Sequence, residues 1–180
     1  SLDSSKLVSP AIQSQLDEKI RGHAIYQSKV SVEQEMARAS SAYQRSTAIV
    51  RRFSEVVRSG KVLDGARTKE VVREITESVE RNPDAMMLLT KLSEKSKETL
   101  NRSVEISVYM TAFGRFLQLP RDKLEVLSML GLLQDSGMLR LPTGLPERRS
   151  QLTVAEDEVF KTHIEHTVEI LSKTPGLPTE

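Results

Sequence analysis

Leu133-Gln134-Asp135-Ser136-Gly137-Met138 is the stretch of this 180-residue chain that decides its fold. It closes a run of leucines at helical spacing, at positions 124, 127, 130 and 133, which predicts a helix. Ser136 and Gly137 favour a turn, so the helix delivers Gln134 and Asp135 at its carboxyl end. Asp135 is then either a carboxylate placed for chemistry or an ordinary residue of the turn.

The rest of the chain follows the helical period as well, and it holds no convincing alternating pattern of the kind that a strand shows. Capping boxes at Ser31 and Thr153 mark two helix starts. The predicted helices cover residues 5–22, 32–59, 68–81, 83–92, 95–118, 121–135 and 154–172, with an exposed loop over 140–152. We therefore predict an all-α bundle with an N-terminal lead-in or linker over residues 1–30 and one helical domain over residues 31–180.

Composition narrows the function classes. Hydrophobic residues make up 38% of the chain and aromatic residues only 4%, without tryptophan, so the core must be aliphatic. The 26 basic and 25 acidic residues balance, which argues against a nucleic-acid partner. The absence of cysteine excludes disulfides and thiolate metal sites and suits the cytoplasm. No apolar run reaches the roughly 20 residues that span a bilayer, so we expect no membrane segment.

Four blocks, in this order, resemble the HD-GYP branch of the HD-domain metal phosphohydrolases. The third block is similar to the Leu-Leu-His-Asp-Ile-Gly-Lys motif of that branch, with its histidine and lysine replaced. The blocks are residues 81–85 (Arg-Asn-Pro-Asp-Ala), residues 102–108 (Arg-Ser-Val-Glu-Ile-Ser-Val), residues 132–142, and residues 152–171 with Lys161-Thr162-His163. The resemblance implies an HD-domain-like helical fold. The Gly-Tyr-Pro block that names the branch would follow Glu180.

Active members of that branch are phosphodiesterases, typically for cyclic di-GMP, with two or three iron or manganese ions. The resemblance places a vestigial site at Glu98, Arg102, Gln134, Asp135, Met138 and His163. Glu98, Asp135 and His163 match family ligands. Arg102 and Gln134 stand where the family has histidine ligands, and Met138 replaces the lysine that faces the phosphate.

The altered positions oppose metal binding. A guanidinium has no lone pair to offer a metal. At 4 Å from a divalent ion, with an effective dielectric constant near 20, Arg102 would repel the ion by about 8 kcal/mol. Without a metal there is neither a hydroxide at neutral pH nor a Lewis acid on the phosphate. We therefore predict that Arg102 instead pairs with Glu98 and Asp135 and fills the empty position.

The sequence favours a degenerate, catalytically inactive HD-GYP-type domain without a cofactor, acting as a regulatory or protein-interaction module in bacterial cyclic di-GMP signalling. Its expected partners are signalling proteins or other domains of a longer chain, cyclic di-GMP, and a second copy. The alternative is an active phosphodiesterase, completed by residues beyond this chain, with iron or manganese on Glu98, Asp135 and His163. A third interpretation is an output domain that never had catalysis and only contacts proteins.

Two further features keep alternatives open. His163 and His166 are one helical turn apart, which suits either a shared metal or a plain surface pair. The arginines of the predicted 32–59 helix line either a dimer or inter-domain surface, or the solvent side of a helix that covers the core. They are Arg45, Arg51, Arg52 and Arg58.

Overall fold

The computed structural model describes residues 26–93 and 99–177, and over these residues the fold is all-helical, without a strand. This confirms the predicted fold class. The α-helices are α2 (Val32–Arg58), α3 (Gly65–Arg81), α4 (Pro83–Ser93), α5 (Thr99–Phe116), α6 (Arg121–Leu133), α7 (Val154–Lys161) and α8 (His163–Ser172), with short 3-10 helices η2 (Ser136–Arg140) and η3 (Pro146–Arg148). The predicted helix over residues 5–22, most of the 1–30 lead-in, and Glu98 lie outside the described residues.

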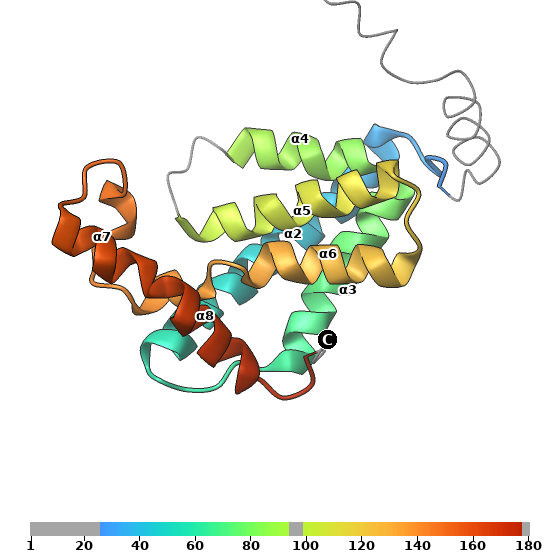
Figure 1. The fold of residues 1–180 in the computed structure, drawn as a ribbon. Coiled ribbons are helices and arrows are strands. Elements are labelled where there is room, and N and C mark those ends of the chain that lie inside the picture. Colours follow the sequence, from blue (N-terminus) through green and yellow to red (C-terminus); the bar gives the residue numbers. More distant parts are fainter. Residues whose placement is uncertain (1–25, 94–98, 178–180) are drawn as a thin grey trace, which may run out of the picture.

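Helices α4, α5 and α6 lie side by side, with α2 and α3 packed across them, and α7 and α8 extend from one end of this bundle (Figure 1). Helix α5 begins and α6 ends at that same end. Helix α8 packs against η2, so the turn after α6 sits between the bundle and the C-terminal helices. This arrangement places residues 134–138 and residue 163 in one region of the fold.

The longest helix, α2, covers the core. Its start is fixed by the predicted capping box, in which Ser31 accepts from the Gln34 amide while the Gln34 side chain accepts from the Ser31 amide. One face is buried, and it includes Tyr43, Val50 and Phe53. The four arginines of the opposite face are exposed. Helix α2 is therefore a core-covering helix, and the dimer or inter-domain role of its arginines stays a prediction.

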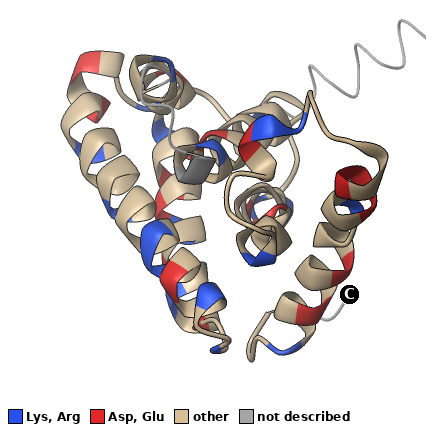
Figure 2. Cartoon of the chain, turned by 90° about the vertical axis from the view of Figure 1, so that its left-hand side faces the viewer, with Lys and Arg blue, Asp and Glu red and all other residues tan. Residues whose placement is uncertain are grey.

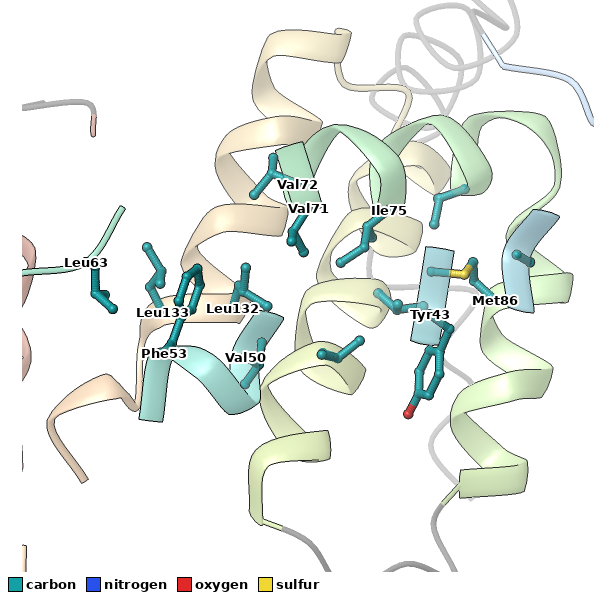
Figure 3. Packing of buried hydrophobic residues seen from close by; sticks show 14 of the residues in the cluster. Tyr43, Val50, Phe53, Leu63, Val71, Val72, Ile75, Met86, Leu132 and Leu133 are labelled. Atoms are coloured by element: carbon teal, nitrogen blue, oxygen red, sulfur yellow. The ribbon is translucent and has the colours of Figure 1, made fainter. Parts of the chain in front are cut away.

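The core is aliphatic, as the composition predicted. Val71, Ile75 and Met86 are fully buried at its centre, and Leu132 and Leu133 join it from α6 (Figure 3). Only two aromatic side chains, Tyr43 and Phe53, belong to this cluster. Burial of aliphatic side chains stabilises a fold by about 1.5–3 kcal/mol each, so this cluster is the main source of stability.

The carboxylate of Glu35 is fully buried in this apolar interior. Glu35, at 0% exposure, accepts hydrogen bonds from Nε and Nη2 of Arg81, both at 2.8 Å, and from the Ser78 hydroxyl at 2.9 Å. Burial raises the pKa of the Glu35 carboxyl, but the Arg81 and Ser78 hydrogen bonds outweigh burial and hold the pKa below its ordinary value. The two hydrogen bonds from Arg81 to Glu35 join the start of α2 to the end of α3.

Two helix predictions need correction. The helix predicted over 68–81 begins earlier, at Gly65, because the Asp64 side chain caps it by accepting from the Ala66 and Arg67 amides. The helix predicted over 154–172 is two helices that meet at Thr162. The Thr162 hydroxyl donates to the Val159 carbonyl at 2.7 Å, and this side-chain bond competes with the helical ladder at the break.

The loop predicted over 140–152 is only partly exposed. Leu141 and Leu145 are buried, at 8% and 4% exposure, and η3 forms one turn within it. The prolines and arginines of this segment led to the prediction of an exposed loop, whereas the two leucines attach the loop to the bundle. The domain boundaries at residues 30 and 31 stay a prediction.

Charges of both signs alternate along the described helices. Acidic and basic residues are interspersed along the described helices, without a single-sign block (Figure 2). Among those helices, none has both the length and the apolar character that crossing a bilayer requires.

Candidate functional site

The 134–137 turn begins where α6 ends. The last helical residue is Leu133, and the Gln134 amide still donates to the Leu130 carbonyl at 2.9 Å. Asp135 follows at the start of η2, and its carbonyl accepts from the Met138 amide at 3.0 Å. The predicted position of Gln134 and Asp135 at the carboxyl end of this helix is confirmed.

Gly137 docks the turn on α8, backbone against backbone. Its amide donates to the Thr167 hydroxyl at 2.9 Å, and that hydroxyl lies 2.9 Å from the His163 carbonyl. A Cβ at position 137 would lie 1.9 Å from the His163 carbonyl oxygen and 2.5 Å from the Thr167 amide. Real side chains do not approach backbone this closely, so this position requires glycine.

The Thr167 hydroxyl also lies 3.3 Å from the Gln134 carbonyl, so it contacts both ends of the turn. A second link is ionic: Arg140 of η2 pairs with Glu169 of α8 at 2.5 Å. Hydrogen bonds from Lys173 and then Arg140 hold the pKa of Glu169 below its ordinary value. Thr167, Arg140 and Glu169 were missed in the sequence. The one available signal was the spacing of His163 and Thr167, which lie one helical turn apart.

His163 is half-buried and its ring is held in place. Its Nδ1 lies 2.6 Å from the Phe160 carbonyl, and the two rings are 4.9 Å apart. A neutral histidine that donates from Nδ1 keeps its lone pair on Nε2. His163 can therefore offer Nε2 to a ligand or a proton, as its resemblance to a family ligand implies. His166, one turn later, is also half-buried.

Arg102 does not make the predicted pair with Asp135. Arg102 is exposed near the start of α5, and within residues 26–93 and 99–177 no ion pair joins it to Asp135. Water solvates an exposed guanidinium well, so pairing would add little stability. The predicted partner Glu98 lies outside the described residues.

Gln134 is exposed, whereas Asp135 and Met138 are half-buried. Of the six predicted site residues, the structure thus brings the 134–138 segment against the α8 segment that starts at His163. It leaves Arg102 at the same end of the bundle, facing solvent (Figure 1).

The described residues of the predicted site offer few ligands for a dinuclear metal centre. Asp135 and His163 provide an oxygen and an imidazole nitrogen, which are suitable ligands for iron or manganese. In the part of the chain that the structure describes, no three His, Cys, Asp or Glu side chains gather closely enough to hold a metal ion. Gln134 and Arg102 supply a neutral amide and a fixed cation where the family resemblance calls for imidazoles.

A sequence profile described as HD domain matches residues 86–179, which is more than half of the chain and includes both the 134–137 turn and His163. The chain belongs to the HD-domain family.

Among curated proteins, a cyclic di-GMP phosphodiesterase of Pseudomonas aeruginosa is 29% identical over 143 residues. This match covers 79% of the present chain but 34% of the phosphodiesterase, so the chain spans about a third of the length of that relative. No solved structure matches the chain.

Proposed function

We propose that this chain is a degenerate HD-GYP-type domain that does not hydrolyse cyclic di-GMP and acts as a regulatory or protein-interaction module in cyclic di-GMP signalling. The link to cyclic di-GMP comes from the activity of the Pseudomonas relative and from the four sequence blocks. The proposed loss of hydrolysis is inferred from the side chains that stand at the family's metal-ligand positions. Where the family resemblance calls for three histidine ligands at positions 102, 134 and 163, this chain keeps one.

The observation that carries the proposal is the small number of suitable donors at the predicted site: Asp135 lies on the turn that packs against α8, and His163 is the first residue of that helix. A carboxylate and one imidazole leave most coordination positions of an iron or manganese ion unfilled. Without the ion, neither group converts water to hydroxide at neutral pH. Met138 also places an apolar thioether where the family resemblance calls for a lysine that meets a phosphate, so this position offers a phosphodiester no cation.

Without hydrolysis, the 134–137 turn and helix α8 can still serve as a binding surface. The 134–137 turn is fixed to α8 through Thr167 and through the Arg140–Glu169 pair. A partner that contacts both α6 and α8 would therefore find the end of α6 held in a fixed position relative to α8. The proposed role is binding, with cytoplasmic signalling proteins, neighbouring domains or cyclic di-GMP as ligands.

The test combines two measurements on the purified chain: metal content by elemental analysis and cyclic di-GMP hydrolysis with added manganese. We expect substoichiometric metal and no turnover. Arg102→His combined with Gln134→His restores two imidazoles, and we expect this variant to bind manganese more tightly than the native chain, measured by calorimetry. Arg102→Lys with Gln134→Asn is the matched control and should bind no better.

Stoichiometric iron or manganese with turnover in the native chain would overturn the proposal. The alternative, an active phosphodiesterase with metal on Glu98, Asp135 and His163, would then hold. Equal manganese affinity of the native chain and the double-histidine variant would also contradict the argument from the donor set.

A further inference from the structure

The outer side of α5 and α6 is apolar. Four of its side chains are exposed: Phe113 at 61%, Leu117 at 49%, Val126 at 41% and Leu130 at 53%. Ile106 and Met110 are half-buried and continue the α5 stripe towards its start. We call these six residues the outer face. On α5 they recur at positions 106, 110, 113 and 117, which is the spacing of one helix side.

The two stripes form one surface because α5 and α6 are in close contact. A Cβ added to Gly131 would lie 2.6 Å from the Ser107 Cα, and one added to Gly114 would lie 2.8 Å from a Leu124 methyl. These pairs show that the helices run antiparallel, and Figure 1 shows them side by side. The buried α5 side chains Val104 and Val108 point to the core, so the outer face lies on the opposite side.

This surface is costly to leave in water. Phe113, one of only four phenylalanines in the chain, belongs to this surface and is 61% exposed. Scattered apolar residues on a surface need no explanation, whereas a continuous stripe over two helices indicates an interaction site.

Charges stand at opposite ends of the outer face. Arg102 lies one helical turn before Ile106 on α5, and Asp122 lies one turn before Val126 on α6. Because the helices are antiparallel, Arg102 is at one end and Asp122 at the other. Over the described residues Arg102 has no ion pair, and Asp122 has only its neighbour Lys123 at 4.0 Å, with both side chains more than 60% exposed.

We propose that the outer face binds a second copy of this chain, about a two-fold axis that runs across α5 and α6. That axis reverses the direction of the helices, so the Arg102 end of one copy meets the Asp122 end of the other. The apolar stripes then cover each other, and two charge pairs form at the rim. A surface with the two charges at the same end would not complement itself in this way.

The size of the outer face suits a reversible dimer. At 1.5 Å per residue the 18 residues of α5 span about 27 Å, and two adjacent helices are about 20 Å wide. The interface would then bury on the order of 500 Å² per copy, close to the lower limit of about 1,000 Å² in total for specific interfaces. We expect association in the micromolar range rather than an obligate dimer.

Sedimentation velocity over a concentration series of the complete chain tests the proposal. We expect a monomer–dimer equilibrium that Phe113→Glu abolishes, while Val154→Glu, at an exposed apolar site on α7, leaves it unchanged. Circular dichroism and thermal melting check that each variant is folded. Phe113 is exposed, so its replacement should leave the melting temperature nearly unaltered.

Charge reversal tests the geometry. Arg102→Glu alone and Asp122→Arg alone each place like charges together and should raise the dimer dissociation constant about tenfold. A mixture of these two variants recreates opposite charges at both rims, so it should associate as tightly as the native chain. A chain that stays monomeric at the highest concentration, or that dimerises despite Phe113→Glu, would refute the proposal. So would a mixture no tighter than the single variants. These readouts involve neither metal nor cyclic di-GMP, so they are independent of the proposed function.

Discussion

The amide of Gly137 and the hydroxyl of Thr167 lie 2.9 Å apart, and this one hydrogen bond joins two segments that are 30 residues apart in the sequence. The donor belongs to the turn that carries Asp135, and the acceptor lies one helical turn after His163. The two titratable residues retained from the HD motif thus share one local framework.

Gly137→Ala should destabilise the fold by about 2–4 kcal/mol, because the added Cβ would meet the His163 carbonyl at 1.9 Å and the backbone must move. Urea denaturation followed by circular dichroism measures the loss. Ser136→Ala is the control next to it. The Ser136 hydroxyl is buried without a hydrogen-bond partner in the described structure, so its removal should be neutral or stabilising. A stable Gly137→Ala variant would contradict the docking described above.

Thr167→Val keeps the size of the side chain but removes the acceptor of the Gly137 amide. A buried amide without a partner costs about 1–3 kcal/mol, so we expect a loss of that size in the free energy of unfolding. Amide hydrogen exchange at Gly137 should also accelerate. Thr167→Ser retains the hydroxyl and should preserve slow exchange. Equal exchange rates in both variants would show that the hydroxyl does not hold the turn.

The Glu35–Arg81 pair predicts acid sensitivity. The folded protein holds the pKa of Glu35 below its ordinary value, so the folded state favours the ionised carboxylate. The stability that this gives is present above the unfolded pKa, near 4.3, and is lost as the pH falls through the lower folded pKa. Denaturation series at pH 7 and pH 3 should therefore show a smaller pH-dependent loss in Glu35→Gln than in the native chain. An identical loss in both proteins would contradict this prediction.

Replacing only Arg81 of the Glu35–Arg81 pair should lower the free energy of unfolding more than replacing both residues. Arg81→Met leaves the Glu35 carboxylate buried without its main partner, which should cost about 3 kcal/mol. The double variant Glu35→Met with Arg81→Met removes both charges, and we expect it to be more stable than Arg81→Met alone. Chemical denaturation of the two variants decides the point, and a double variant weaker than the single one would be the contrary result.

The contact of α5 with α6 gives a further prediction. Gly131→Ala would place a Cβ 2.6 Å from the Ser107 Cα, so the helices must separate, with an expected cost of about 2–3 kcal/mol. Separation would also lengthen the hydrogen bond from the Ser107 hydroxyl to the Ser128 carbonyl, now 2.7 Å. Lys123→Ala, on the exposed side of α6, is the control and should change stability by less than about 0.5 kcal/mol. Thermal melting compares them, and equal melting temperatures would oppose the prediction.

Local patterns predicted local structure well. The capping boxes at Ser31 and Thr153 are both present, and both fix the helix starts that the sequence indicated. The position of Gln134 and Asp135 after α6 followed from leucine spacing and the adjacent turn residues. Such features depend on neighbours within four residues, which a single sequence displays.

Features that depend on tertiary contact were missed. Thr167 looks like any threonine within a helix until η2 packs beside it. The pair predicted for Arg102 and Asp135 assumed that family ligand positions converge, but the guanidinium faces solvent. The loop was predicted to be exposed because it contains several prolines and arginines. That prediction used the average composition of the segment, and it could not show that two of its leucines, Leu141 and Leu145, pack against the bundle.

The Gly131–Ser107 approach has a consequence for communication within the domain. Where Gly131 meets Ser107, no side chain separates the two backbones, so a displacement of one helix at this point should move the other. Helix α6 ends at the turn that carries Asp135, and the α5 segment bears four of the six residues of the outer face. We therefore expect a molecule bound to the outer face to displace the turn that carries Asp135.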